Sequence, residues 1–139
     1  MFVGLYKYGV DLKGRLFIPA KFRAKNHFIV TIGLDKCLYV YPKNTWEKLE
    51  HKLETLEFKN KSEERAFKRI LLSGASEVIP DAQGRILIPL ALRDYAGIKK
   101  DVVIIGASYK IEIWSIDIWQ SYYKSAEKIF AKHAGSLEI

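Results

Sequence analysis

The amino-acid sequence predicts an α+β fold, mainly β, in which two similar halves intertwine into one barrel-like sheet with helices at its rim. A motif occurs twice, 70 residues apart, as Asp11-Leu-Lys-Gly-Arg15-Leu-Phe-Ile-Pro19 and Asp81-Ala-Gln-Gly-Arg85-Ile-Leu-Ile-Pro89. β-type segments surround each copy, and each half ends in a helical pattern. Neither half has enough strands to close a sheet alone, and 139 residues usually form one domain. We therefore expect a single pseudo-symmetric domain over residues 1–139, with a first repeat at 1–72 and a second at 73–139.

The chain begins with a predicted strand, a tight turn and a second strand, at residues 2–10, 11–14 and 15–18. Aspartate at the first turn position accepts hydrogen bonds from backbone amides two residues on, and glycine takes a positive φ at little cost. This chemistry is typical of a short hairpin loop.

Each motif ends in a proline, which stops the strand and can be the first residue of a helix. Short helices are therefore expected at residues 20–25 and 90–96, and further strands at 28–32, 37–41, 102–105 and 110–114. Gly97 suits the position just after the second short helix, where a left-handed conformation is common.

Each half is expected to end in a long helix with a capping signal. In Asn44-x-x-Glu47 and Asp117-x-x-Gln120, a capping side chain and its reciprocal partner stand three residues apart. The first helix carries an apolar stripe at Trp46, Leu49, Leu53 and Leu56. A further helix is expected at 62–72, with an inward face at Phe67, Ile70 and Leu71, and the last helix from about residue 118. Trp46 and Trp119 are expected to be core residues.

The net charge of +7 is concentrated near the N-terminus. Residues 1–30 hold one acidic residue, Asp11, and six basic ones, namely Lys7, Lys13, Arg15, Lys21, Arg23 and Lys25, so +5 of the charge lies there. A concentrated basic face fits a polyanionic partner, although many small basic proteins bind none.

The cysteine count and the hydropathy pattern indicate the compartment. A single cysteine, Cys37, excludes an internal disulfide and a cysteine-rich zinc site, which fits a reducing cytosol. The longest apolar run, at 102–107, is too short to span a bilayer, and residues 1–10 do not read as a signal peptide. We expect a cytoplasmic protein with no membrane partner.

The repeated turn places Arg15 and Arg85 at the start of the returning strand. A guanidinium there can bind phosphate or read the O6/N7 edge of guanine with two hydrogen bonds. Lys13 at the first tip suits a phosphate, whereas Gln83 at the second tip can hydrogen-bond to a base edge. Alternatively, Asp11 and Arg15 simply pair and stabilise the turn.

No catalytic constellation is recognisable in the sequence. His27, His51 and His133 lie far apart without ligands at metal-binding spacing, and neither a G-x-S-x-G motif nor a phosphate-binding glycine loop is present. We expect neither an enzyme, nor a cofactor, nor a metal site.

The doubled motif resembles the signature of the MraZ family of bacterial transcriptional regulators, within the AbrB/SpoVT-like superfamily. Arg23 and Arg93 share the 70-residue offset, and Met1-Phe2-x-Gly4 and Glu112-Ile113-Trp114 are also similar to the family. The resemblance implies a double-split β-barrel, a ring-shaped homo-oligomer and a nucleoid-associated regulator, expected to be a repressor, of the division and cell-wall gene cluster.

In that family the Asp-x-x-x-Arg turns form the surface that contacts DNA, and the promoters carry short direct repeats. Carried over, the DNA contacts fall on Lys13, Arg15 and Arg85, while Asp11, Gly14, Asp81 and Gly84 shape the turns. One departure is Pro80, which removes a backbone donor beside Asp81 and predicts a second turn of different geometry.

Three hypotheses follow for the function. In the leading one, the protein is a sequence-specific binder of double-stranded DNA, in which Gln83 can contact a base and Lys7, Lys21 or Arg23 contact phosphates in addition to the turn residues. In the second, it is an oligomeric assembly module whose turns are structural. In the third, it binds single-stranded RNA through its tyrosines and its positive charge.

Overall fold

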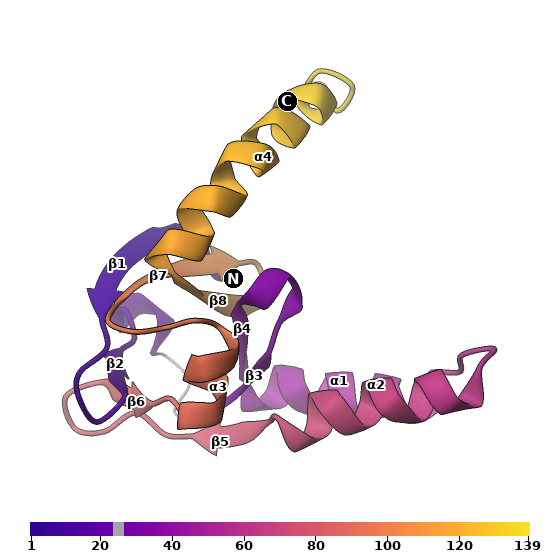
Figure 1. Cartoon of the computed structure of the whole chain (residues 1–139), viewed down its shortest axis with the longest axis horizontal. Coiled ribbons are helices and arrows are strands. Elements are labelled where there is room, and N and C mark those ends of the chain that lie inside the picture. The colour runs from indigo at the N-terminus through magenta and orange to yellow at the C-terminus, as the bar shows by residue number, and fades with distance from the viewer. Residues whose placement is uncertain (24–26) are drawn as a thin grey trace.

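The computed structural model describes residues 1–23 and 27–139. Its elements are, in chain order, β1 Leu5–Gly9, β2 Arg15–Phe17, the 3₁₀ turn η1 Ala20–Phe22, β3 Phe28–Ile32, the 3₁₀ turn η2 Leu34–Lys36, β4 Leu38–Pro42, α1 Lys43–Thr55, α2 Lys61–Ser73, β5 Ser76–Val78, β6 Arg85–Leu87, α3 Leu90–Tyr95, β7 Asp101–Ala107, β8 Lys110–Ser115 and α4 Ile116–Ala134. The α+β class is confirmed. A β-rich body carries two helical arms, the α1–α2 hairpin and α4 (Figure 1).

Six strands form one antiparallel sheet in the order β1-β7-β8-β4-β3-β5. The order is symmetric between the repeats, because β1, β3 and β4 correspond to β5, β7 and β8. Three of the five ladders, β1–β7, β4–β8 and β3–β5, join one repeat to the other, so the halves intertwine as expected. In the part of the chain that the structure describes, no ladder joins β5 back to β1, so these two strands are the sheet edges.

The two strands that follow the repeated turns pair with each other. Arg15 lies opposite Leu87, Leu16 opposite Ile86, and Phe17 opposite Arg85 in the β2–β6 ladder. The expected hairpin between residues 2–10 and 15–18 is therefore wrong, because β1 pairs with β7 instead. This arrangement fully buries both Leu16 and Ile86, a long-range gain that local turn chemistry does not reveal.

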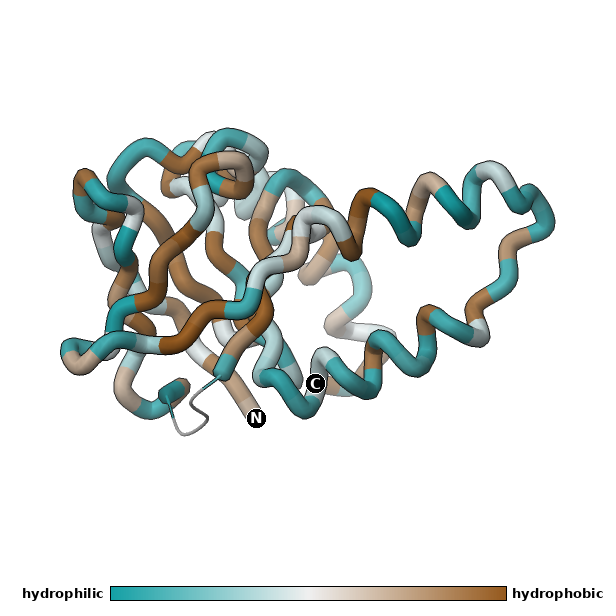
Figure 2. The backbone as a smooth tube through the Cα atoms, turned by 90° about the horizontal axis from the view of Figure 1, so that it is seen from below, coloured by the Kyte–Doolittle hydropathy of each residue, from teal (hydrophilic) through white to brown (hydrophobic). Residues whose placement is uncertain are grey.

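One hydrophobic core lies between the six-stranded sheet and the β2–β6 ribbon. It contains the inward residues of both repeats, among them Leu16, Ile86, Phe28 and Ile104. Figure 2 shows the hydrophobic residues concentrated along the strands of the body. Trp46 is buried as expected, but Trp119 is only partly buried and packs on Trp114, with ring centroids 5.3 Å apart.

Both capping boxes predicted for the long helices are wrong. Helix α1 follows β4 directly from Pro42, and the side chain of Asn44 accepts from the neighbouring Thr45 amide instead of capping the helix. In α4 the capping residue is Ser115, whose hydroxyl accepts from the Ile118 amide at 3.1 Å. Each helix begins earlier than predicted because the preceding strand continues into it without a loop.

The short helices are confirmed in part. Helix α3 ends as expected before Gly97, which has φ +63°. The first short helix is the 3₁₀ turn η1, and the remainder of the expected segment 20–25 extends into residues 24–26, which lie outside the described residues.

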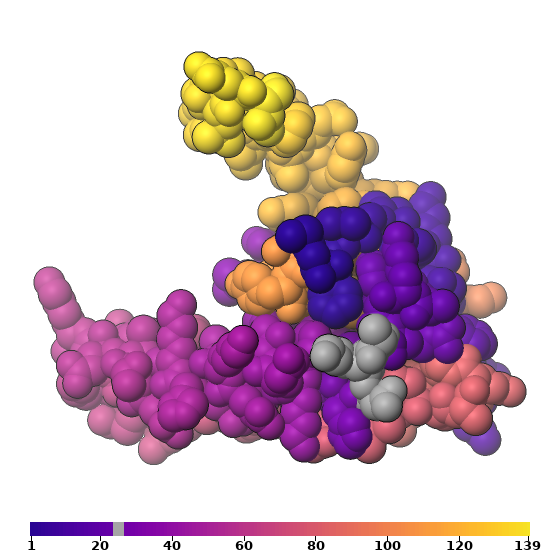
Figure 3. Space-filling view, turned by 180° about the vertical axis from the view of Figure 1, so that it is seen from behind, coloured from indigo at the N-terminus to yellow at the C-terminus, as the bar shows by residue number. Residues whose placement is uncertain are grey.

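The α1–α2 hairpin leaves apolar surface uncovered. Helix α2 begins after Asn60, whose side chain accepts from the Glu63 amide. Phe67 and Ile70, expected to face inward, are exposed because the hairpin projects from the body, as Figure 3 also shows from behind. Their side chains line a hollow of about 680 Å³ between the hairpin and the sheet.

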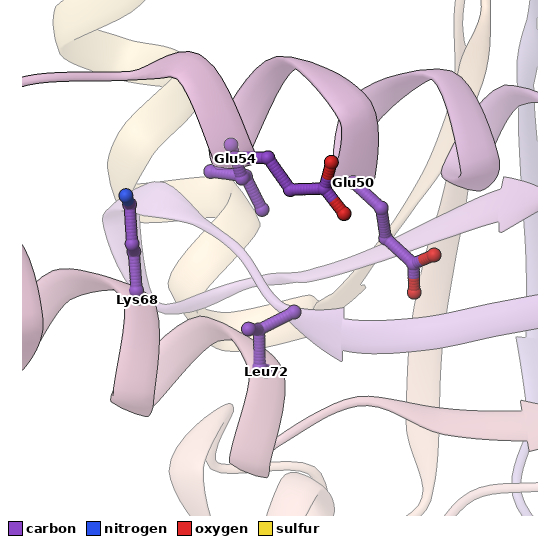
Figure 4. Close-up of a pocket in the computed structure, with 5 residues that line it drawn as sticks. Glu50, Glu54, Lys68 and Leu72 are labelled. Atoms are coloured by element: carbon purple, nitrogen blue, oxygen red, sulfur yellow. The ribbon is translucent and has the colours of Figure 1, made fainter.

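A smaller hollow of about 370 Å³ lies between the two helices of this hairpin. Glu50 and Glu54 of α1 and Lys68 and Leu72 of α2 line it from opposite sides (Figure 4). The ammonium group of Lys68 donates hydrogen bonds to the Leu56 carbonyl and to the Glu64 carboxylate, so Lys68 stabilises the α1–α2 hairpin.

Candidate nucleic-acid interface

The first repeated turn is organised around the carboxylate of Asp11. One oxygen, Oδ1, accepts from the amides of Lys13 and Arg15, each at 2.9 Å. The other, Oδ2, accepts from Nε of Arg15 at 2.6 Å. Gly14 has φ +87° and donates its amide to the Asp11 carbonyl at 3.0 Å. The side-chain pair foreseen as the alternative to DNA binding is therefore present.

The second turn has the same geometry as the first. Asp81 accepts from the amides of Gln83 and Arg85 at 2.9 and 3.0 Å and from Nε of Arg85 at 2.9 Å. Gly84 has φ +82°. The expectation that Pro80 changes this turn is wrong, because the amide that proline lacks is not used in the turn, which is closed by the Asp81 amide on the Arg85 carbonyl.

Both turn aspartates are held in their charged form. The amide of Arg15 that donates to Asp11 lowers the pKa of this carboxyl group, and the Arg15 side chain lowers it further. At Asp81 the amide and then the side chain of Arg85 lower the pKa in the same way. Near neutral pH, each turn therefore presents an ionised pair held by backbone hydrogen bonds.

The two turns lie side by side at one end of the body, where the loops that precede β2 and β6 are seen in Figure 1. The Ile18 amide donates to the Gly84 carbonyl at 3.0 Å, and the Ile88 amide donates to the Gly14 carbonyl at 2.9 Å. Arg85 also extends across, with Nη1 4.0 Å from Oδ2 of Asp11. The turns thus form one unit with contributions from both repeats.

The outer face of the β2–β6 ribbon combines cationic and apolar groups. Arg15 and Arg85 alternate with the buried Leu16 and Ile86, and their side chains are 33% and 20% exposed. Phe17 is exposed beside them, with its ring centre 5.9 Å from Cζ of Arg85. A two-stranded β-ribbon has the width that the major groove of DNA admits.

Pairing with aspartate does not use all the hydrogen-bond donors of the two arginines. Each uses Nε for its own aspartate, and among the described residues the terminal nitrogens of Arg15 have no hydrogen-bond partner. A guanidinium whose Nε is paired still has its two terminal nitrogens, which can donate in parallel. The aspartate that holds Nε limits the directions in which these nitrogens point.

The remaining predicted contact residues are spread over more than one surface. Lys13 and Gln83 are exposed at the two turn tips. Lys7 is exposed on β1, which belongs to the other sheet. Lys21 is also exposed, with its ammonium 5.0 Å from the centre of the Tyr6 ring. Arg23 is half-buried over Gly84, so its guanidinium is already in contact with protein.

Sequence reasoning did not assign a role to Arg93 at this site. The structure places its guanidinium against Gly14, and its Nε donates to the Ile88 carbonyl at 3.0 Å. The available signal was the 70-residue offset that it shares with Arg23.

Metal binding and membrane insertion are the other possibilities for residues 1–23 and 27–139. There, no cluster of three or more His, Cys, Asp or Glu side chains is arranged to hold a metal ion. No helix in these ranges is long and apolar enough to cross a membrane.

Comparison with known proteins identifies the family. A family model described as "MraZ protein, putative antitoxin-like" matches the chain twice, over residues 1–70 and 71–137. The chain belongs to the MraZ family. Each of the two matched ranges contains one of the Asp-x-x-Gly-Arg turns described above.

MraZ relatives are similar to the chain over nearly its full length. "Transcriptional regulator MraZ" of Natranaerobius thermophilus is 51% identical over 132 residues, which cover 94% of this chain and 92% of the relative. The proteins of the same name from Heliobacterium modesticaldum and Desulfitobacterium hafniense are 48% and 49% identical, each covering 99% of this chain and 96% of the relative.

Proposed function

We propose that this protein is a sequence-specific DNA-binding transcriptional regulator and not an enzyme. The observation that carries the proposal is the β2–β6 ribbon, on which Arg15 and Arg85 lie on one exposed face, each anchored by its own aspartate. The naming of its relatives as transcriptional regulators supports it. An anchored guanidinium is suited to a base edge, because it loses little freedom on binding.

In this proposal the ribbon enters the major groove, and Arg15 and Arg85 contact guanine or phosphate. Lys13 contacts a phosphate and Gln83 a base edge, so the two turns read different positions. Lys7 and Lys21 add phosphate contacts from neighbouring surfaces. Arg23 fits a supporting role better than a phosphate contact, because its guanidinium lies over Gly84.

We also propose a ring-shaped homo-oligomer that binds short direct repeats in promoter DNA. Large apolar side chains that a solitary chain leaves exposed support self-association, among them Phe67 and Ile70 on α2 and Ile129 and Phe130 on α4. The family resemblance further supports a double-split β-barrel of the AbrB/SpoVT-like type, built from repeats 1–72 and 73–139. It also supports a cytoplasmic, nucleoid-associated repressor of the division and cell-wall gene cluster.

Fluorescence anisotropy tests the DNA proposal with a duplex from upstream of the protein's own gene and a scrambled duplex. We expect Arg15→Ala to reduce specific affinity by about 5- to 150-fold, which corresponds to about 1–3 kcal/mol for a lost guanine contact. Arg65→Ala is the matched control, because Arg65 is an exposed arginine on α2 and lies outside the ribbon.

The other outcomes distinguish the competing functions. Equal and salt-sensitive binding of both duplexes would show that the protein binds DNA through a basic surface without sequence specificity. Preference for single-stranded RNA would favour an RNA-binding protein, and oligomers without nucleic-acid affinity would favour an assembly module. Unchanged specific affinity in a folded Arg15→Ala variant would remove Arg15 from the interface.

A further inference from the structure

We propose that Arg93 and Arg23 are positioning residues, each of which holds the DNA-contacting turn of the other repeat. The bracing follows from geometry alone, while its consequence for DNA rests on the proposed function. Neither arginine belongs to the exposed face of the ribbon, and both are half-buried behind the turns.

The brace on the first turn comes from Arg93. Gly14 is buried although it belongs to an exposed turn, and a Cβ atom placed on it would lie 2.8 Å from Cζ of Arg93. The same guanidinium donates through Nε to the Ile88 carbonyl, while the Ile88 amide donates to the Gly14 carbonyl at 2.9 Å. Arg93 therefore fixes both the glycine and the residue that hydrogen-bonds to it.

Arg23 lies against the glycine of the second turn. Gly84 is buried, and a Cβ atom there would lie 2.6 Å from Cζ of Arg23. The Ile18 amide donates to the Gly84 carbonyl at 3.0 Å. Nε of Arg23 is buried and, within residues 1–23 and 27–139, has no hydrogen-bond partner, so the described contacts brace the first turn more fully than the second.

These contacts explain why arginine rather than lysine stands at position 93, where Nε has an acceptor. A planar guanidinium can lie flat on the backbone of a glycine and still donate sideways through Nε, which an ammonium group cannot do. Arg15 is one residue from Gly14, so movement of that glycine also moves the anchored guanidinium of Arg15. A binding group that is displaced by about 1 Å loses much of its contact energy.

Hydrogen–deuterium exchange of the full-length protein tests the brace without DNA. In Arg93→Lys we expect faster exchange in peptides covering residues 11–14, in the other repeat, and unchanged exchange at 81–84. In Arg23→Lys we expect the reverse. Arg65→Lys is the control and should change neither turn. Unchanged exchange at 11–14 in Arg93→Lys, or equal acceleration at both turns, would overturn the crosswise brace.

A salt titration of DNA binding separates positioning from direct contact. If Arg93 positions the turn, Arg93→Lys lowers affinity for the promoter duplex. The loss is no larger than that caused by Arg15→Ala, and the slope of log K against log salt stays that of the wild type. If Arg93 contacts a phosphate, lysine preserves affinity and Arg93→Met reduces the slope by about one, which would overturn the positioning role. Arg93→Met keeps an unbranched stem, and its melting temperature verifies folding.

A double variant that combines Arg93→Lys with Arg15→Ala completes the test. The losses from Arg93→Lys and Arg15→Ala should be non-additive, because both act through the first turn. Additive losses would contradict the brace. If the wild-type protein does not prefer its promoter, the proposed function fails, whereas the exchange result on the two turns still decides the brace.

Discussion

At the residue scale, the candidate interface depends on two carboxylates that each organise a turn and an arginine. Asp11 accepts two amides and one guanidinium nitrogen, and Asp81 does the same 70 residues later. The role of aspartate and glycine in these turns was predictable, because it depends on local backbone chemistry. The position of Arg93 was not, because the glycine that it contacts, Gly14, lies in the other repeat.

The turn aspartates predict a specific response to acid. Folding lowers the pKa of Asp11 and Asp81 below the ordinary value of 3.8, so both contribute stability above that value and lose it as the pH falls through the folded pKa. Thermal unfolding should therefore show no contribution from the two groups to pH dependence between about pH 5 and 8, and a loss below about pH 4.

The double variant Asp11→Asn/Asp81→Asn provides the comparison, since asparagine keeps one oxygen acceptor but does not titrate. Its melting temperature should be lower than that of the wild type at neutral pH, and the difference should shrink on acidification. A constant difference from about pH 7 to pH 3 would show that the carboxylate charge contributes nothing to the turns.

At the scale of elements, strand positions were predicted better than strand partners. Short runs rich in β-branched and aromatic residues located β3, β4, β7 and β8 to within two residues, because such runs depend only on neighbours in the chain. The partners of β1 and β2 depend on burial of Leu16 and Ile86 in a shared core, which no local pattern encodes. For the same reason, the exposure of Phe67 and Ile70 was mispredicted: their helical spacing shows a stripe but not whether anything covers it.

The N-terminal segment packs closely over β7 and predicts a sensitive position at Gly106. Its amide donates to the Gly4 carbonyl, and a Cβ atom there would lie 2.5 Å from the carbonyl carbon of Phe2. Gly106→Ala should push this segment outward, separate Phe2 from Phe22, and lower the free energy of unfolding by about 1–3 kcal/mol.

Denaturant unfolding measures this cost, and Gly135→Ala is the control. Apart from its chain neighbours and its own helix, no described residue comes within 4 Å of a Cβ placed on Gly135 at the end of α4, so its substitution should stay within about 0.5 kcal/mol of the wild type. Equal stabilities for the Gly106→Ala and Gly135→Ala variants would show that the segment yields without cost.

At the scale of the whole molecule, the candidate interface and the apolar arms lie on different parts of the structure. The ribbon lies at one end of the body, while the α1–α2 hairpin and α4 project from it (Figures 1 and 3). Association through the arms would therefore leave the ribbon exposed. Several subunits could then bind several DNA repeats, and the spacing between repeats would have to match the spacing between subunits.

This arrangement predicts that affinity depends on the number of promoter repeats. Duplexes with two or more correctly spaced repeats should bind the wild type about 10²- to 10⁴-fold more tightly than a duplex with one. Phe130→Asp, on the exposed face of α4, should reduce the mass measured by light scattering and remove this gain without changing single-repeat affinity.

Gln120→Asp, at an exposed polar position of α4, is the control for the added charge. It should leave both the mass and the gain from multiple repeats unchanged. If the Phe130→Asp variant still assembles, this residue does not belong to the subunit contact. If the affinity gain from multiple repeats persists in dissociated subunits, multivalency is not its cause.

The exchange of strands between repeats also affects how the chain can fold as it leaves the ribosome. Among the described strands of the first repeat, β3 and β4 pair with each other, whereas β1 pairs with β7, β2 with β6, and the other edge of β4 with β8. A nascent chain that ends before residue 100 thus exposes unpaired strand edges. Completion of the sheet must await synthesis of β8, and the many distant contacts should make folding slow.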